Sequence, residues 1–148
     1  FSRIMSLKDG SKKMSKSEPS DLSRINLSDG ENQIINKIKK AKTDPLPLPS
    51  NKEELNKRPE AKNLVGIYSS LTNSTLDDSI ERFSGNNFSD FKEELSQALV
   101  DKIRPISSEI KKLLEESSYL DKILEEGREN ANEIASKKIK KIHEIMGF

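Results

Sequence analysis

Residues 12–17 read Lys12-Lys13-Met14-Ser15-Lys16-Ser17, so three lysines and two serines lie within six consecutive positions. The turn-forming pair Asp9-Gly10 precedes this stretch, and Glu18-Pro19 follows it. Lysine ammonium groups pair with phosphate oxygens, serine hydroxyls donate hydrogen bonds, and successive backbone N–H groups in a turn bind anions. The stretch therefore predicts a loop that handles polyphosphate, although a solvated basic turn is the commoner explanation of a generic cluster of this kind.

The segment around this loop is basic and starts with a predicted strand. Residues 3–7 alternate apolar and polar side chains and predict a strand over residues 1–8, which leads into a loop over residues 9–22. Residues 1–44 hold ten Lys/Arg and six Asp/Glu, a balance of +4, whereas the whole chain carries only +1. The positive excess therefore lies beside the loop, where an anionic ligand would bind.

A helix and a proline-rich segment are predicted next. Apolar residues recur at helical spacing from Glu31. We expect this helix to end near Thr43-Asp44, because Pro45 disfavours helix at the residue before it. Residues 45–49 then alternate proline with leucine, which favours an extended segment. We interpret residues 45–57 as a semi-rigid connector, with a proline-motif ligand for a partner as the less favoured alternative.

From Arg58 onward the pattern is helical, with breaks at turn-forming residues. Asn73-Ser74-Thr75 separates two helices, and Thr75 with Asp78 forms a capping-box-like start for the second. Gly85-Asn86-Asn87 is a turn before the longest helix. We interpret the apolar stripe of that helix as a bundle core and not as a zipper-like seam. The stripe consists of Phe91, Leu95, Leu99, Ile103, Ile106, Ile110, Leu113 and Leu114.

Two residues are expected to disturb the helices that follow. Pro105 lacks an N–H and crowds the carbonyl four residues back, so we expect a kink or an interruption near Lys102. Ser117-Ser118 separates the longest helix from a shorter one, which Gly127 ends or bends. A last helix then runs to the end of the sequence.

Composition excludes some kinds of site. The chain has no cysteine, so it can form neither a disulfide framework nor a thiolate zinc site. Hydrophobic residues make up 32% and charged residues 34%, which suits thin, surface-rich helical structure. No long apolar span or signal peptide is present, so we expect a cytoplasmic setting. The only histidine, His143, lies in the last predicted helix, where a surface or helix-end role is far commoner than catalysis.

Residues 13–17 resemble the KMSKS loop of class I aminoacyl-tRNA synthetases. The order and spacing of later segments resemble the C-terminal half of the bacterial tryptophanyl-tRNA synthetases, and the resemblance covers nearly the whole chain. Glu18 stands where many relatives have aspartate, which is a mild departure. The later segments that carry the resemblance are residues 34–44, 63–72, 91–95 and 104–106 and the Gly147-Phe148 end.

The resemblance implies a mostly α fold in three parts. Residues 1–44 would be the end of a Rossmann-type α/β catalytic domain, with one strand plus the KMSKS loop. Residues 45–57 would be the proline-rich connecting loop. Residues 58–148 would be an α-helical bundle that forms the anticodon-binding region.

The resemblance also implies roles for the loop residues. Lys13 and Lys16 would be catalytic, stabilising the ATP phosphates and the leaving pyrophosphate. Met14 would lie along the adenosine and offer its backbone N–H, and Lys12 would be a solvated neighbour. The implied ATP-binding residues are Ile4, Lys13, Met14, Ser15, Lys16 and Ser17. Magnesium would arrive with ATP, held by phosphate oxygens and water, so no protein metal site is expected.

The expected reaction is ATP-dependent activation of tryptophan followed by transfer to tRNA(Trp), by a homodimer in the full-length protein, with no DNA or membrane partner. The residues that we expect to touch the tRNA are Arg104, Lys111, Lys137 and Lys141.

We expect the sequence to be part of a longer protein and inactive by itself. Only one candidate strand precedes the loop, and neither a Gly-rich turn nor a His-containing phosphate motif is present. The tryptophan pocket would lie in the other half. Two alternatives stay open: part of a tyrosyl-tRNA synthetase, or a non-catalytic helical tRNA-binding module that keeps the loop as a relic.

Overall fold

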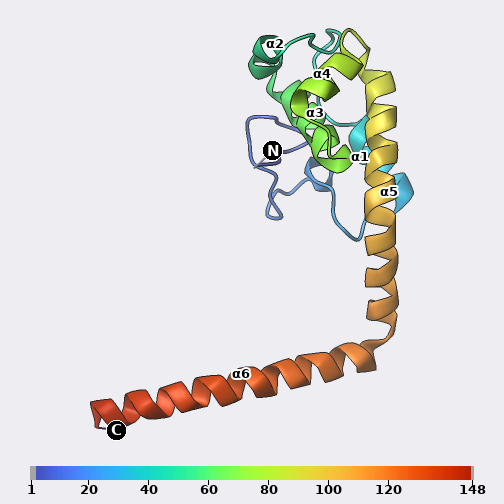
Figure 1. Ribbon diagram of the computed structural model, residues 1–148. Coiled ribbons are helices and arrows are strands. Elements are labelled where there is room, and N and C mark those ends of the chain that lie inside the picture. The colour runs from blue at the N-terminus through green and yellow to red at the C-terminus, as the bar shows by residue number, and fades with distance from the viewer. Residues whose placement is uncertain (1–2, 148) are drawn as a thin grey trace. The chain divides into compact units, whose positions relative to one another are not determined.

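The computed structural model describes residues 3–147 and is mostly helical, which confirms the predicted fold class (Figure 1). Two compact units are present, one reaching to Ser108 and the other starting at Glu109. A 3-10 turn, η1, spans Asp21–Ser23. The α-helices are α1 (Glu31–Lys39), α2 (Lys52–Lys57), α3 (Pro59–Thr72), α4 (Leu76–Phe83), α5 (Phe88–Glu115) and α6 (Ser117–Met146).

The core of the first unit lies where α3, α4 and α5 meet. Tyr68, Phe83 and Phe91 come from these three helices and are all buried. The ring of Phe83 lies edge-on to both others, with centroid distances of 4.8 Å to Tyr68 and 4.8 Å to Phe91. Edge-to-face aromatic pairs stabilise a core beyond the area they bury. Figure 1 shows α3 and α4 beside the first half of α5.

The apolar stripe of α5 is a core only over its first half. Phe91, Leu95 and Ile103 are buried. Ile106 is 45% exposed and Leu114 is 67% exposed, so the bundle-core interpretation is wrong for the second half of the stripe. The buried part is the first half, where Tyr68 of α3 and Phe83 of α4 pack on Phe91.

Pro105 and Gly127 do not end their helices. The helix α5 runs without interruption from Phe88 to Glu115, and α6 runs from Ser117 to Met146. The predicted interruption near Lys102 and the predicted helix end at Gly127 are therefore wrong, whereas a kink at the first site and a bend at the second stay predictions. A proline removes a single N–H from the hydrogen-bond pattern, and buried residues on both sides of Pro105, Ile103 and Ser107, hold the helix in place.

The predicted strand over residues 1–8 is replaced by a single bridge. Residues 1 and 2 lie outside the described residues. Within the part that is described, Met5 forms an isolated antiparallel bridge with Lys13. On its other side, the Asn63 side chain accepts from Met5 N–H and donates to Met5 O, both at 2.8 Å. A buried side-chain amide thus takes the place that a neighbouring strand would occupy.

The first helix ends earlier than predicted, at Lys39 instead of Thr43-Asp44. The chain leaves the helix because the Lys42 N–H donates to Leu7 O at 2.8 Å. The Lys92 ammonium then donates to Ala41 O at 2.7 Å and to Lys39 O at 3.3 Å, beside the end of α1. Burial lowers the pKa of Lys92.

The connecting segment 45–57 is packed within the first unit and contains α2, which the sequence pattern did not predict. Leu48 and Leu55 are buried in the core. The Arg58 guanidinium donates to Asp44 Oδ2 at 2.9 Å and to Pro47 O at 2.6 Å. Burial works to raise the pKa of Asp44, but the hydrogen bonds from Arg58 and from the Leu46 N–H, together with the positive charge of Arg58, outweigh it, and the pKa lies below its usual range.

The second unit consists of the last turns of α5 and the whole of α6. Among the described residues of α6 none is buried. Large apolar side chains on it are exposed, including Leu124 and Ile145. No helix in the described part of the chain is long and apolar enough to cross a membrane.

Candidate phosphate-binding loop

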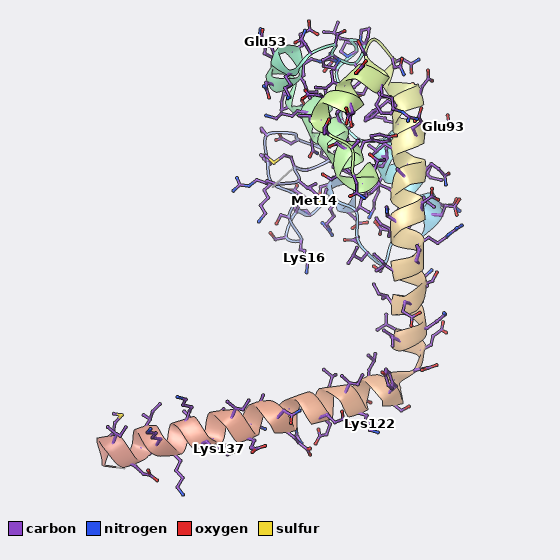
Figure 2. The ribbon with its side chains drawn as sticks, viewed as in Figure 1. Met14, Lys16, Glu53, Glu93, Lys122 and Lys137 are labelled. Carbon is purple, nitrogen blue, oxygen red and sulfur yellow. The ribbon has the colours of Figure 1, made fainter. Side chains whose placement is uncertain are left out.

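The predicted loop presents its polar side chains to solvent. Lys13, Ser15, Lys16 and Ser17 are exposed, and Met14 is half-buried with its side chain packed against the core. In Figure 2 the Lys16 side chain extends away from the loop. The two ammonium groups are therefore free to approach a ligand, while Met14 anchors the loop between them.

A short hydrogen-bonded turn fixes the positions of Ser15 and Ser17 relative to each other. The hydroxyls of Ser15 and Ser17 lie 2.9 Å apart, and the Ser17 N–H donates to Ser15 Oγ at 3.3 Å. Hydroxyl-to-backbone turns of this kind hold a loop in a compact form. The serine hydroxyls and the lysines thus occupy one short exposed segment.

The backbone upstream of the loop's tip is paired with residues 4–6. The Ser6 N–H donates to Lys12 O at 2.8 Å, and the Met14 N–H donates to Ile4 O at 3.1 Å. The predicted contact of the Met14 N–H with adenosine therefore requires this second bond to open. Ile4, another predicted ATP-binding residue, accepts that bond and so lies directly beside Met14.

Gly10 lets the turn before the loop pack closely against the start of α3. A Cβ atom at Gly10 would lie 2.6 Å from both Glu60 N and Pro59 C, which is closer than real Cβ contacts allow. Next to it, hydrogen bonds from Ser11 hold the pKa of Asp9 below its usual range. The loop is thus seated on the helical part by a glycine that no other residue can replace without a shift of backbone.

We expect Gly10→Ala to lower the free energy of unfolding by about 1–3 kcal/mol, because the added methyl group meets backbone that cannot rotate away. Urea unfolding of the 148-residue chain checks this. Gly127→Ala is the matched control, since a Cβ at Gly127 meets no atom within 4 Å and alanine favours helix. Equal losses of stability in both variants would contradict the account of Gly10.

The four predicted tRNA-contacting residues are all exposed. Arg104 belongs to the first unit, and Lys111, Lys137 and Lys141 belong to the second. Lys137 and Lys141 are four residues apart on α6 and share one face of that helix. The Lys137 ammonium pairs with Glu133 at 2.6 Å, on the surface, where such a pair is weak.

The described residues contain no group of three or more His, Cys, Asp or Glu side chains that could hold a metal ion. The residues that support the loop were not predicted from the sequence; they are Gly10, Arg24, Lys37 and Asn63. Gly10 carried a signal, because Asp9-Gly10 is a turn-forming pair. Asn63 and Lys37 carried no signal in the sequence, because their partners lie far away in the sequence or in another element.

Known proteins match this chain over nearly all of its length. The tryptophan–tRNA ligase of Agrobacterium fabrum is 51% identical over 146 residues, which cover 99% of this chain and 41% of that ligase. The tryptophan–tRNA ligase of Rhizobium meliloti is 48% identical with the same coverage. The chain thus spans about two fifths of the length of the curated relatives it matches.

A solved structure matches as well. The tryptophanyl-tRNA synthetase from Mycoplasma pneumoniae superposes with a TM-score of 0.62 at 27% sequence identity, covering 74% of this chain and 35% of that one. The sequence model of the family described as "tRNA synthetases class I (W and Y)" matches residues 1–104. These matches confirm the resemblance inferred from the loop and the later segments. Since the family match covers most of the 148 residues, this chain belongs to the class I tRNA synthetases of the tryptophan and tyrosine group.

Proposed function

We propose that this chain is the C-terminal part of a tryptophan–tRNA ligase, which activates tryptophan with ATP and transfers it to tRNA(Trp). The observation that carries the proposal is 51% identity to a tryptophan–tRNA ligase across 99% of the chain, together with the exposed loop at residues 13–17. The two ligases and the solved synthetase are tryptophan enzymes, which favours tryptophan over tyrosine. We propose the same division of the chain as before. The catalytic end comprises residues 1–44, the connector residues 45–57 and the anticodon-binding region residues 58–148.

In this proposal Lys13 and Lys16 act on the phosphates of ATP. The tryptophan carboxylate attacks the α-phosphorus, the bond to pyrophosphate breaks, and negative charge grows on the leaving group. Two ammonium groups beside the β- and γ-phosphates stabilise that charge more in the transition state than in the ground state. The exposure of both side chains on one short loop supports this role.

Ser15, Ser17 and Met14 complete the ATP site in this proposal, with Ile4 beside them. The hydroxyls would donate to phosphate oxygens and give up the contact between Ser15 and Ser17. Magnesium would come with ATP and supply further charge neutralisation, held by phosphate oxygens and water. We place the full-length protein in the cytoplasm as a homodimer without DNA or membrane partners.

We also propose that the helical part grips tRNA through Arg104, Lys111, Lys137 and Lys141. Reversing two of these charges, in Lys137→Glu with Lys141→Glu, is expected to weaken tRNA binding and reduce its salt dependence. The slope of log K against log salt should fall by about one for each tRNA phosphate that the variant no longer binds. Filter binding of tRNA(Trp) to the full-length protein at several salt concentrations measures both quantities.

A matched control separates local contacts from net charge. Lys57→Glu with Lys62→Glu changes the charge equally at two exposed lysines in the first unit. That variant should keep the salt slope, because neither lysine is among the proposed contacts. Identical binding by the α6 variant and the unmodified protein would remove α6 from the tRNA site.

Aminoacylation tests the proposed function as a whole. The full-length protein, obtained by extending the reading frame upstream, is expected to charge tRNA(Trp) with tryptophan. Charging of tRNA(Tyr) with tyrosine would instead assign the tyrosine branch of the family.

A further inference from the structure

We propose that Arg24 is a positioning residue for the reaction, and that Lys37 holds it in place through Asp21. This inference rests on the proposed function, because it concerns the loop that would bind ATP. None of the three residues belongs to the loop at 13–17 or to the residues that would touch ATP.

Arg24 holds the downstream end of the loop. Its Nη1 donates to Glu18 O at 2.9 Å, one residue after Ser17. Its Nη2 lies 3.1 Å from Asp21 Oδ1, and its Nε donates to Asn26 Oδ1 at 3.3 Å. A guanidinium presents five donors in a rigid plane, so these three contacts define where the Glu18 carbonyl lies.

Lys37 in turn holds Asp21 against α1. The Lys37 residue is 3% exposed, and its Nζ lies 2.7 Å from Asp21 Oδ2 and 2.6 Å from Asp29 Oδ2. The hydrogen bond from Lys37, followed by that from Asn26, lowers the pKa of Asp21. Asp21 therefore stays a carboxylate and connects the Lys37 ammonium in the interior to the Arg24 guanidinium near the loop.

Burial of the Lys37 ammonium requires it to keep these two carboxylate partners. Burial of an ammonium without partners is strongly unfavourable. The helix that carries it is itself seated in the core through Ile34 and Ile38. The path from the core to the loop thus runs Lys37, Asp21, Arg24 and Glu18.

The path ends at the loop, where the position of the Lys16 ammonium determines the rate of the reaction. The upstream end of the loop is held by the pairing of residues 4–6 with residues 12–14, and Arg24 holds the downstream end. Lys16 lies two residues before Glu18, so a displacement of the Glu18 carbonyl moves the Lys16 ammonium. A misplacement of about 1 Å at a reacting centre can cost on the order of a hundredfold in rate.

The test is steady-state ATP–pyrophosphate exchange by the full-length protein carrying Arg24→Gln. We expect kcat to fall about tenfold to a hundredfold, with the KM for tryptophan changed less than about twofold and the melting temperature nearly kept. Arg24→Lys should not restore the rate, because one ammonium cannot reproduce the planar set of contacts. Lys12→Gln is the matched control: it removes one charge near the loop, from a side chain that is 74% exposed, and should leave kcat unchanged.

A double variant tests the path to Lys37. Lys37→Gln should lower the same kcat, and adding Arg24→Gln to it should cost less than the product of the two single effects, because both act through Asp21. Tryptophan-dependent exchange at the unmodified rate in Arg24→Gln would overturn the positioning role and leave the proposed function standing. Full recovery of kcat in Arg24→Lys would also overturn it. So would a loss of rate in Arg24→Gln that is accompanied by a comparable loss of stability, seen as a lower melting temperature. No exchange by the unmodified protein would instead overturn the proposed function and this inference with it.

Discussion

Replacing Lys16 by alanine in the full-length protein is expected to lower tryptophan-dependent ATP–pyrophosphate exchange by about a hundredfold or more. The reason is that the ammonium meets charge that develops only as pyrophosphate leaves. Tryptophan binding should change little, because the exposed Lys16 side chain lies on a loop that would meet phosphate and not the amino acid. Exchange kinetics and equilibrium binding of tryptophan measure the two effects separately.

Lys12→Ala is the matched control for this prediction. Lys12 is the neighbouring exposed lysine, paired with Asp9 at 3.4 Å, and has no proposed contact with ATP. Its removal should leave the exchange rate within about twofold. A rate in Lys16→Ala that equals that of Lys12→Ala would remove Lys16 from the catalytic assignment.

Phe91→Ala should lower the free energy of unfolding by about 3–5 kcal/mol. Phe91 is fully buried, and its ring centroid lies 4.8 Å from that of Phe83 and 6.1 Å from that of Tyr68. The substitution removes the ring from a packed aromatic cluster and leaves a cavity between three helices. Urea unfolding of the 148-residue chain, followed by helical circular dichroism, gives the value.

The control for Phe91 is Leu46→Ala, in the same unit. Leu46 is a large apolar residue that is 60% exposed, so its replacement should cost less than about 0.5 kcal/mol. Comparable destabilisation in both variants would show that the cluster of Tyr68, Phe83 and Phe91 is not the centre of the core.

Local signals predicted the turns and caps of the helical part well. Thr75 and Asp78 form the expected capping box, with the Asp78 N–H donating to Thr75 Oγ1 at 3.1 Å and the Thr75 N–H donating to Asp78 Oδ2 at 3.0 Å. Gly85 takes the left-handed conformation expected of a turn glycine, with φ at 75°. These features depend on residues a few positions apart, so the sequence contains all that determines them.

Features that depend on distant partners could not be predicted in the same way. Asn63 pairs with the backbone of Met5, 58 positions away, and so occupies the place of a second strand. The helix α1 ends early because Lys42 bonds to Leu7. The burial of the α5 stripe changes along its length because α3 and α4 cover its first half, which no periodicity reveals.

The candidate site also has one part that the local sequence predicts and one part that depends on distant contacts. The loop residues follow from a short motif, since the chemistry of phosphate binding requires lysines and hydroxyls close together in sequence. The residues that seat the loop were not predicted as such, because each works through a contact in three dimensions. Gly10 meets α3, and Arg24 reaches back to Glu18 while Lys37 reaches out from α1.

Amino-acid-dependent ATP–pyrophosphate exchange by the full-length protein, with tryptophan and tyrosine compared side by side, tests whether this chain is part of a tryptophan enzyme. We expect exchange with tryptophan alone. Exchange with tyrosine alone would move the protein to the tyrosine branch of its family. Exchange with neither would contradict catalysis and favour a helical tRNA-binding module that keeps the loop without its reaction.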